Sequence, residues 1–232
     1  MSLQAKLENY IEAPDVPENS FEIGWEYELI GQYASAMGYY LKCAELTDND
    51  LLAYECLCRK AICFTKAGDR ECHVQTNANL AIALLPQRPE AYHILACSYE
   101  RTNDWHESYM ISCAAQKLNG DRTPLLYNLD DRCCEYPGYF ALPFQEAVAL
   151  WWIGRFKECI AKFREVKELE GIDADYIGHC QWNIDNLEGK DADALAGLKE
   201  ASPTKTITDK DEIIKKMLAG LIIFSYITPK KK

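Results

Sequence analysis

Apolar residues recur at spacings of three and four along nearly the whole chain, and no stretch alternates for long between apolar and polar positions. Spacings of three and four place apolar side chains on one face of an α-helix, whereas strict alternation is typical of a β-strand. The pattern therefore predicts an all-α fold in which many helices each bury one face.

A short pattern, in which a turn residue is followed by an aromatic residue and then by small and apolar residues, occurs several times. The clearest copies begin at Gly31, Asn103 and Gly154, and weaker copies begin at Gly68 and Gly189. These turn positions are separated by 37, 35, 51 and 35 residues. Three of the separations are nearly equal, which is typical of a chain built from repeated pairs of helices.

This pattern resembles the tetratricopeptide repeat, in which two antiparallel helices form a unit of about 34 residues and pack through small residues. The third copy matches best, because Tyr92 and Ala96 precede the turn at Asn103 and Ser108 follows it at the expected positions. The resemblance covers residues 18–200. It implies a right-handed α-solenoid of four to five helix pairs.

A narrower resemblance rests on motifs that include Trp25-Glu26-Tyr27-Glu28, Leu52-Ala53-Tyr54-Glu55, Tyr136-Pro137-Gly138-Tyr139 and Trp151-Trp152. Together they are similar to repeat modules attached to, or encoded near, family 2 glycosyltransferases of bacteria, phages and other viruses. This resemblance implies association with a sugar-transfer system. It does not imply that the chain itself catalyses a reaction.

We expect three parts along the chain: a lead-in at 1–17, the helical repeats at 18–200, and a linker, capping helix and basic tail at 201–232. The longest separation between turns predicts an aromatic loop insertion at about 117–142. The loop either covers an apolar seam or shapes a pocket. In the last part, Asp209 can begin a helix that covers the apolar face of the final repeat.

The chain has 36 acidic and 25 basic residues among its 232, so its formal net charge is −11. We expect no nucleic-acid partner, because such a surface repels phosphate groups, and basic or neutral partners are easier to accommodate. Membrane attachment is not expected either, since the longest apolar stretch, 217–227, is shorter than the roughly 20 residues of a membrane span. The 11 scattered cysteines predict reduced thiols in the cytoplasm, or in a host cytoplasm if the chain is viral.

No set of residues in the sequence predicts catalysis or metal binding. Two acidic motifs, at 173–175 and 191–193, have the spelling of a glycosyltransferase metal site, but both stand at predicted helix starts, where the helix dipole favours acidic residues. His93 and Cys97 lie one helical turn apart and form a Cys/His pair by spacing alone. We therefore predict no enzyme activity, no catalytic residue, no metal and no cofactor.

In tetratricopeptide proteins the first helix of each repeat lines a concave groove, and the resemblance implies the same here. Two adjacent tryptophans cannot both face one core, since neighbouring helical residues are rotated by about 100°, so we expect one of Trp151 and Trp152 to reach the groove or an interface. The expected groove residues are Trp25, Glu28, Cys58, Ile62, His93, Cys97, Glu100, Arg101, Phe144, Val148, Trp151 and Trp152.

The predicted function is that of a non-catalytic scaffold or adaptor, which binds an extended or helical protein segment in the groove in association with a glycosyltransferase system. Two alternatives stay open. The groove and loop bind a glycan or sugar nucleotide as a module of a glycosyltransferase, or the chain is a self-assembling structural protein of a virus. In the second alternative the C-terminal helix packs on another copy and forms a homodimer.

Overall fold

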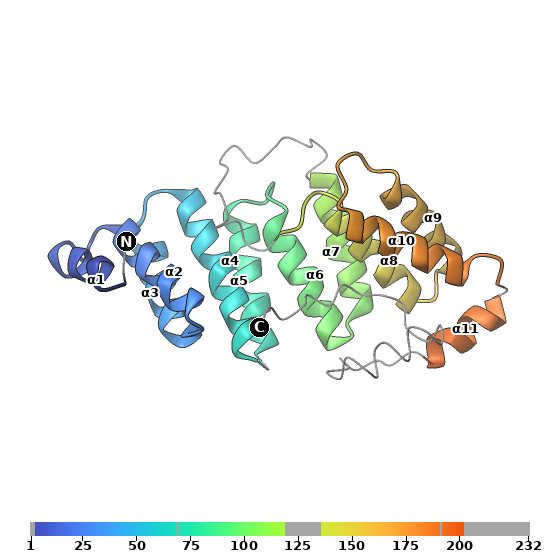
Figure 1. The fold of residues 1–232 in the computed structure, drawn as a ribbon, viewed down its shortest axis with the longest axis horizontal. Helices are drawn as coiled ribbons and strands as arrows, with labels where there is room; N and C mark the ends of the chain where they lie inside the picture. The colour runs from blue at the N-terminus through green and yellow to red at the C-terminus, as the bar shows by residue number, and fades with distance from the viewer. Residues whose placement is uncertain (1–2, 69, 119–135, 191, 202–232) are drawn as a thin grey trace. The chain divides into compact units, whose positions relative to one another are not determined.

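The computed structural model describes residues 3–68, 70–118, 136–190 and 192–201. Every regular element within these ranges is an α-helix, which confirms the predicted all-α class (Figure 1). The chain divides into two compact units. The first comprises Met1–Ser98 and Lys117–Tyr136, and the second comprises Tyr99–Gln116 and Pro137–Lys232.

In the first unit, consecutive helices from α1 to α5 pack side by side. α6 belongs to this unit as far as Ser98, whose hydroxyl donates a hydrogen bond of 2.6 Å to Glu71 on α5. The helices are α1 (Leu3–Glu12), α2 (Pro17–Leu29), α3 (Tyr33–Leu46), α4 (Asp50–Ala67), α5 (Glu71–Leu84) and α6 (Glu90–Thr102).

In the second unit, α9 packs against both α8 and α10. The core there is aromatic, and the ring of Phe144 meets the rings of Phe163 and Tyr176 edge to face, with centroids 5.6 and 5.0 Å apart. Edge-to-face contacts are favoured by the quadrupoles of the rings. The helices are α7 (Trp105–Leu118), α8 (Ala141–Trp152), α9 (Phe156–Lys167), α10 (Ala174–Leu187) and α11 (Ala192–Ala201).

The five predicted turns are confirmed, because each lies between two helices and has a backbone of positive φ. The angle is 77° at Gly31, 86° at Gly68, 63° at Asn103, 85° at Gly154 and 78° at Gly189. Glycine adopts this conformation without a Cβ clash, and asparagine is among the residues that tolerate it best. The repeated pattern in the sequence therefore marks the tight turn within each pair of helices.

Small residues let the helices of the first unit approach one another closely. Ala36 and Cys43 on α3 are fully buried. On α2, a Cβ added at Gly24 would lie 2.9 Å from the ring of Tyr40 on α3. The contact between α2 and α3 therefore depends on the missing side chain of Gly24.

Two polar residues stand at the starts of helices, where their side chains accept hydrogen bonds from backbone N–H groups. Oδ1 of Asp173 accepts a hydrogen bond of 2.8 Å from the backbone N–H of Asp175, which confirms that the first acidic motif begins a helix. Asn49 begins α4 in the same way and accepts from the backbone of Leu51 and Leu52. The second acidic motif lies at the start of α11, and its Asp191 falls outside the described residues.

The structure refines the ends of the expected parts. The expected lead-in at 1–17 contains the helix α1, in which Leu3, Leu7 and Tyr10 follow helical spacing. The expected loop at 117–142 is shorter at both ends, since α7 continues to Leu118 and α8 begins at Ala141. Its middle, and the capping helix and tail expected after residue 201, lie outside the described residues. Within the described ranges, no helix is both long and apolar enough to cross a membrane.

Candidate functional site on the first helices

A group of charged side chains in contact with one another surrounds Arg59 on α4 in the first unit. We call this group, together with the adjoining indole, the Arg59 cluster: Trp25, Glu28, Glu55, Arg59 and Lys66. Nε of Arg59 donates a hydrogen bond of 2.8 Å to Glu55, one turn earlier on the same helix. Its Nη1 lies 3.5 Å from Oε2 of Glu28 on α2, and its guanidinium lies 4.4 Å from the centroid of the Trp25 ring. Nζ of Lys66 lies 3.4 Å from the other oxygen of Glu28.

Three charged side chains of this cluster are almost completely buried. Arg59 is 3% exposed, Glu55 1% and Glu28 9%. Charges buried to this extent are tolerated in proteins when they are paired and hydrogen-bonded. The hydroxyl of Tyr40 donates a further hydrogen bond of 2.7 Å to Glu28, and burial together with the charge of Glu28 raises the pKa of Tyr40 far above its usual range.

Two members of the Arg59 cluster reach the surface, since Trp25 is half-buried and Lys66 is exposed. The expected groove residues Cys58 and Ile62 on α4 are buried and pack inside the unit. The surface above the cluster therefore presents an indole ring held by a guanidinium, with an ammonium group nearby. Trp and Arg are the residues that most often dominate binding energy at protein interfaces.

A second buried network holds the start of α6 against α4. The hydroxyl of Tyr54 donates a hydrogen bond of 3.1 Å to Glu90 and accepts one of 3.0 Å from the backbone N–H of Ala91. Nη2 of Arg88 lies 2.5 Å from the other oxygen of Glu90. Because Glu90 is 1% exposed and held on both sides, its role is to position α6.

Two expected groove residues on α6 contact each other. Nε2 of His93 lies 3.6 Å from Sγ of Cys97, and both side chains are half-buried. The ring of Tyr136 meets the imidazole edge to face, with centroids 5.6 Å apart. The spacing seen in the sequence thus corresponds to a real contact between thiol and imidazole.

In the second unit, three of the six expected groove residues belong to the core. Phe144, Val148 and Trp151 are each 1% exposed or less. The adjacent Trp152 is half-buried and stacks on Trp105, with centroids 4.9 Å apart and an angle of 15° between the rings. Of the two neighbouring tryptophans, only Trp152 has surface that a ligand could touch.

The remaining expected groove residues of the second unit lie at the end of α6. Glu100 accepts a hydrogen bond from the side-chain amide of Gln145 on α8, and Arg101 is exposed. Glu100 therefore holds the last turn of α6, which belongs to the second unit, against α8. Arg101 has the exposure that a contact residue needs.

Sequence reasoning missed Arg59, which organises the first-unit site. The signal that was present is its spacing, since Glu55 stands four residues earlier and pairs of this kind meet on a helix surface. Nothing in the sequence indicated that the pair would be buried against Trp25 and Glu28.

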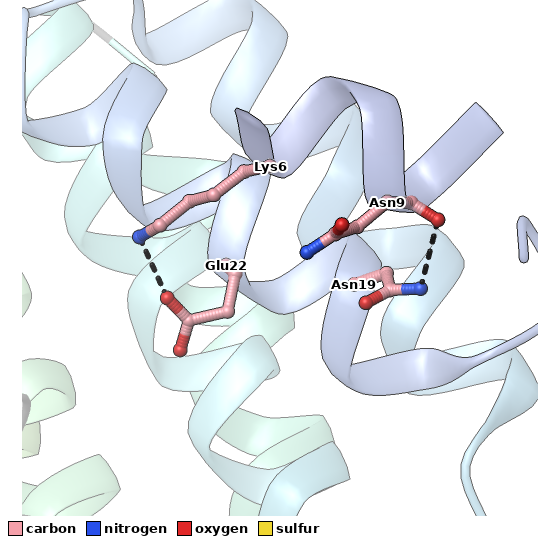
Figure 2. Close-up of a pocket in the computed structure, with 4 residues that line it drawn as sticks. All are labelled: Lys6, Asn9, Asn19 and Glu22. Carbon is pink, nitrogen blue, oxygen red and sulfur yellow. Dashed lines mark hydrogen bonds and ion pairs between the residues drawn. The ribbon is translucent and has the colours of Figure 1, made fainter. Parts of the chain in front are cut away.

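A small crevice lies between α1 and α2, lined by Lys6, Asn9, Asn19 and Glu22 (Figure 2). Nζ of Lys6 lies 2.7 Å from Glu22 and 2.7 Å from Glu26, and the amide of Asn19 donates to the backbone oxygen of Asn9. Burial lowers the pKa of Lys6, but its hydrogen bonds to the two carboxylates outweigh this and raise it. These contacts across the crevice hold α1 against α2. We assign the crevice no ligand.

No group of three or more His, Cys, Asp and Glu side chains in the described part of the chain is placed to hold a metal ion. No protein-family model and no curated protein matches the chain. The tetratricopeptide resemblance and the link to glycosyltransferases therefore stay predictions.

Proposed function

We propose that the chain is a non-catalytic interaction protein, whose surface around Trp25 and Arg59 binds an extended or helical segment of another protein. The helix pairs act in this proposal as tetratricopeptide-like repeats, and the location is the cytoplasm. The observation that supports it most is the Arg59 cluster, in which a half-exposed indole is held by a buried and paired guanidinium.

Pre-ordering of the cluster favours binding. Arg59 is already fixed by Glu55, Glu28 and Trp25, so a partner that packs on the indole does not have to immobilise these side chains. The exposed ammonium group of Lys66, which is paired with Glu28 of the same cluster, offers a charged contact. The net charge of −11 favours a partner segment that is neutral or basic overall.

The test is selection of binding peptides from a random library displayed on phage, followed by affinity measurement with the purified chain. Trp25→Ala should weaken the selected peptides by at least about tenfold, which corresponds to about 1.4 kcal/mol. The matched control is Leu80→Ala on α5, which removes another exposed apolar side chain of the same unit. Equal affinity for Trp25→Ala and wild type, with both folded by circular dichroism, would overturn the proposal.

The association with a sugar-transfer system rests on the resemblance of the aromatic motifs. Its test is affinity capture from the native source or host, with mass spectrometry of the retained proteins. We expect a glycosyltransferase to be retained by the wild type and lost with Trp25→Ala. Retention of unrelated proteins alone would argue against this association.

A glycan-binding role is a second candidate, and the Trp105–Trp152 stack in the second unit favours it. Both indoles are half-buried, and the guanidinium of Arg155 lies 4.9 Å from the ring centroid of nearby Tyr109. Small-ligand sites are lined mainly by apolar and aromatic side chains with a few polar groups that fix the ligand. Glycans should then change tryptophan fluorescence in the wild type and in Trp25→Ala, but not in Trp152→Ala.

A further inference from the structure

Among the cysteines that the structure describes, Cys97 stands out by its contact with an imidazole. Its Sγ lies 3.6 Å from Nε2 of His93, one turn earlier on α6. The ring of Tyr136 packs edge-on against His93 at 70° and limits the rotation of the imidazole. Both residues are half-buried and keep part of their surface exposed to solvent.

Most of the other described thiols are shielded. Burial raises the pKa of Cys180 to about 12 and raises that of Cys159 still further. Burial and the charge of Glu146 also raise the pKa of the half-buried Cys113. A thiol of raised pKa is protonated at neutral pH and reacts slowly, because the thiolate is the nucleophile.

Cys72 on α5 provides an internal comparison. It is exposed, and the neighbouring imidazole of His73 stacks on the ring of Phe64, with centroids 4.8 Å apart. Exposure alone would make Cys72 the more reactive thiol. Contact with an imidazole would instead favour Cys97.

We propose that Cys97 is a site of oxidation by small hydroperoxides, with His93 as the group that accepts and returns its proton. The site shares no residue with the Arg59 cluster, and its chemistry does not depend on peptide binding. It is a stoichiometric modification of the chain rather than a catalytic cycle.

The reaction balances with a hydroperoxide as the oxidant. Nε2 of neutral His93 accepts the thiol proton, and the Cys97 thiolate attacks the terminal oxygen of the peroxide. An S–O bond forms, the O–O bond breaks, and the imidazolium returns the proton to the leaving oxygen. The sulfur loses two electrons and becomes a sulfenic acid, while the peroxide gains them and leaves as an alcohol, or as water when it is hydrogen peroxide.

The test treats the reduced full-length chain with limiting hydrogen peroxide and traps sulfenic acids with dimedone. Chymotryptic peptides are then quantified by mass spectrometry, so that Cys97 and Cys72 are measured separately. We expect Cys97 to be labelled at least about threefold faster than Cys72, because His93 takes up the thiol proton and the thiolate is the form that reacts.

Two variants sharpen the test. His93→Gln should lower the labelling rate of Cys97 to that of Cys72 or below and leave Cys72 unchanged. His73→Gln is the matched control and should leave Cys97 unchanged. Labelling of Cys72 that equals or exceeds that of Cys97 in the wild type overturns the proposal, and so does an unchanged Cys97 rate in folded His93→Gln.

Discussion

The two units of the chain are built from similar helix pairs but stabilised by different interiors. The first unit buries charged side chains such as Arg59 and Glu55 beside small residues, thiols and the rings of Tyr40 and Tyr54. The second unit buries large aromatic rings, among them Trp151 and Phe163, which are both fully buried. The same turn pattern therefore supports one interior that depends on charge pairing and another that depends on filled volume.

The largest effect is expected from Trp151→Ala in the aromatic interior. Removing a fully buried indole should lower the free energy of unfolding by about 3–5 kcal/mol, measured by urea denaturation. Trp152→Ala is the control, with an expected loss of about 1–2 kcal/mol because its ring is half-buried. In Trp151→Ala, peptide-resolved hydrogen exchange should show that the backbone amides of α8 to α10 exchange faster than in the wild type. Similar losses for the two variants would contradict the dependence of the second unit on the buried ring of Trp151.

Arg59→Met tests the charged interior of the first unit. It leaves the carboxylates of Glu55 and Glu28 buried without their shared cation, which should cost about 3 kcal/mol by urea denaturation. Lys66→Met, at the exposed end of the same cluster, should cost less than about 1 kcal/mol. A stability of Arg59→Met equal to wild type would show that charge pairing does not hold this interior together.

Alanine substitutions at two helical glycines of the first unit should have opposite effects on stability, because one glycine is closely packed and the other is not. Gly24→Ala should destabilise by about 1 kcal/mol, since its Cβ would meet the buried ring of Tyr40, which its hydrogen bond to Glu28 holds in place. Gly38→Ala on α3 meets open space and should stabilise by about 0.5–1 kcal/mol, because alanine favours a helix. Thermal unfolding of both variants measures the difference, and effects of the same sign would refute it.

The smallest effect concerns pH and the second unit. Burial lowers the pKa of the half-buried His179 below its ordinary 6.5, although Asp175 and Asp173 oppose this. The unfolded chain then binds this proton more readily than the folded one, so stability should fall as the pH drops below about 6.5. In His179→Gln, the free energy of unfolding from urea denaturation should no longer show this fall below about pH 6.5. An unchanged pH profile would mean that His179 does not contribute.

Local rules of the chain allowed the helices and turns to be predicted. Gly31 and Asn103 mark turns because few residues tolerate positive φ, and Asp173 marks a helix start because its carboxylate accepts from the following backbone. The site was less accessible to sequence reasoning. Whether Trp151 or Trp152 is buried, and whether Arg59 meets Trp25, depends on side chains of other helices that no spacing within one helix specifies.

The attachment of α1 has a consequence for the dynamics of the first unit. None of its residues is fully buried, and it is held mainly by Lys6 to Glu22 and Glu26 and by the contact of Tyr10 with Tyr39. Such a helix can detach while the remaining helices stay folded, because little apolar surface becomes exposed. Its backbone amides should exchange with solvent earlier than those of α2 to α5, and added salt should speed this exchange by screening the Lys6 ion pairs.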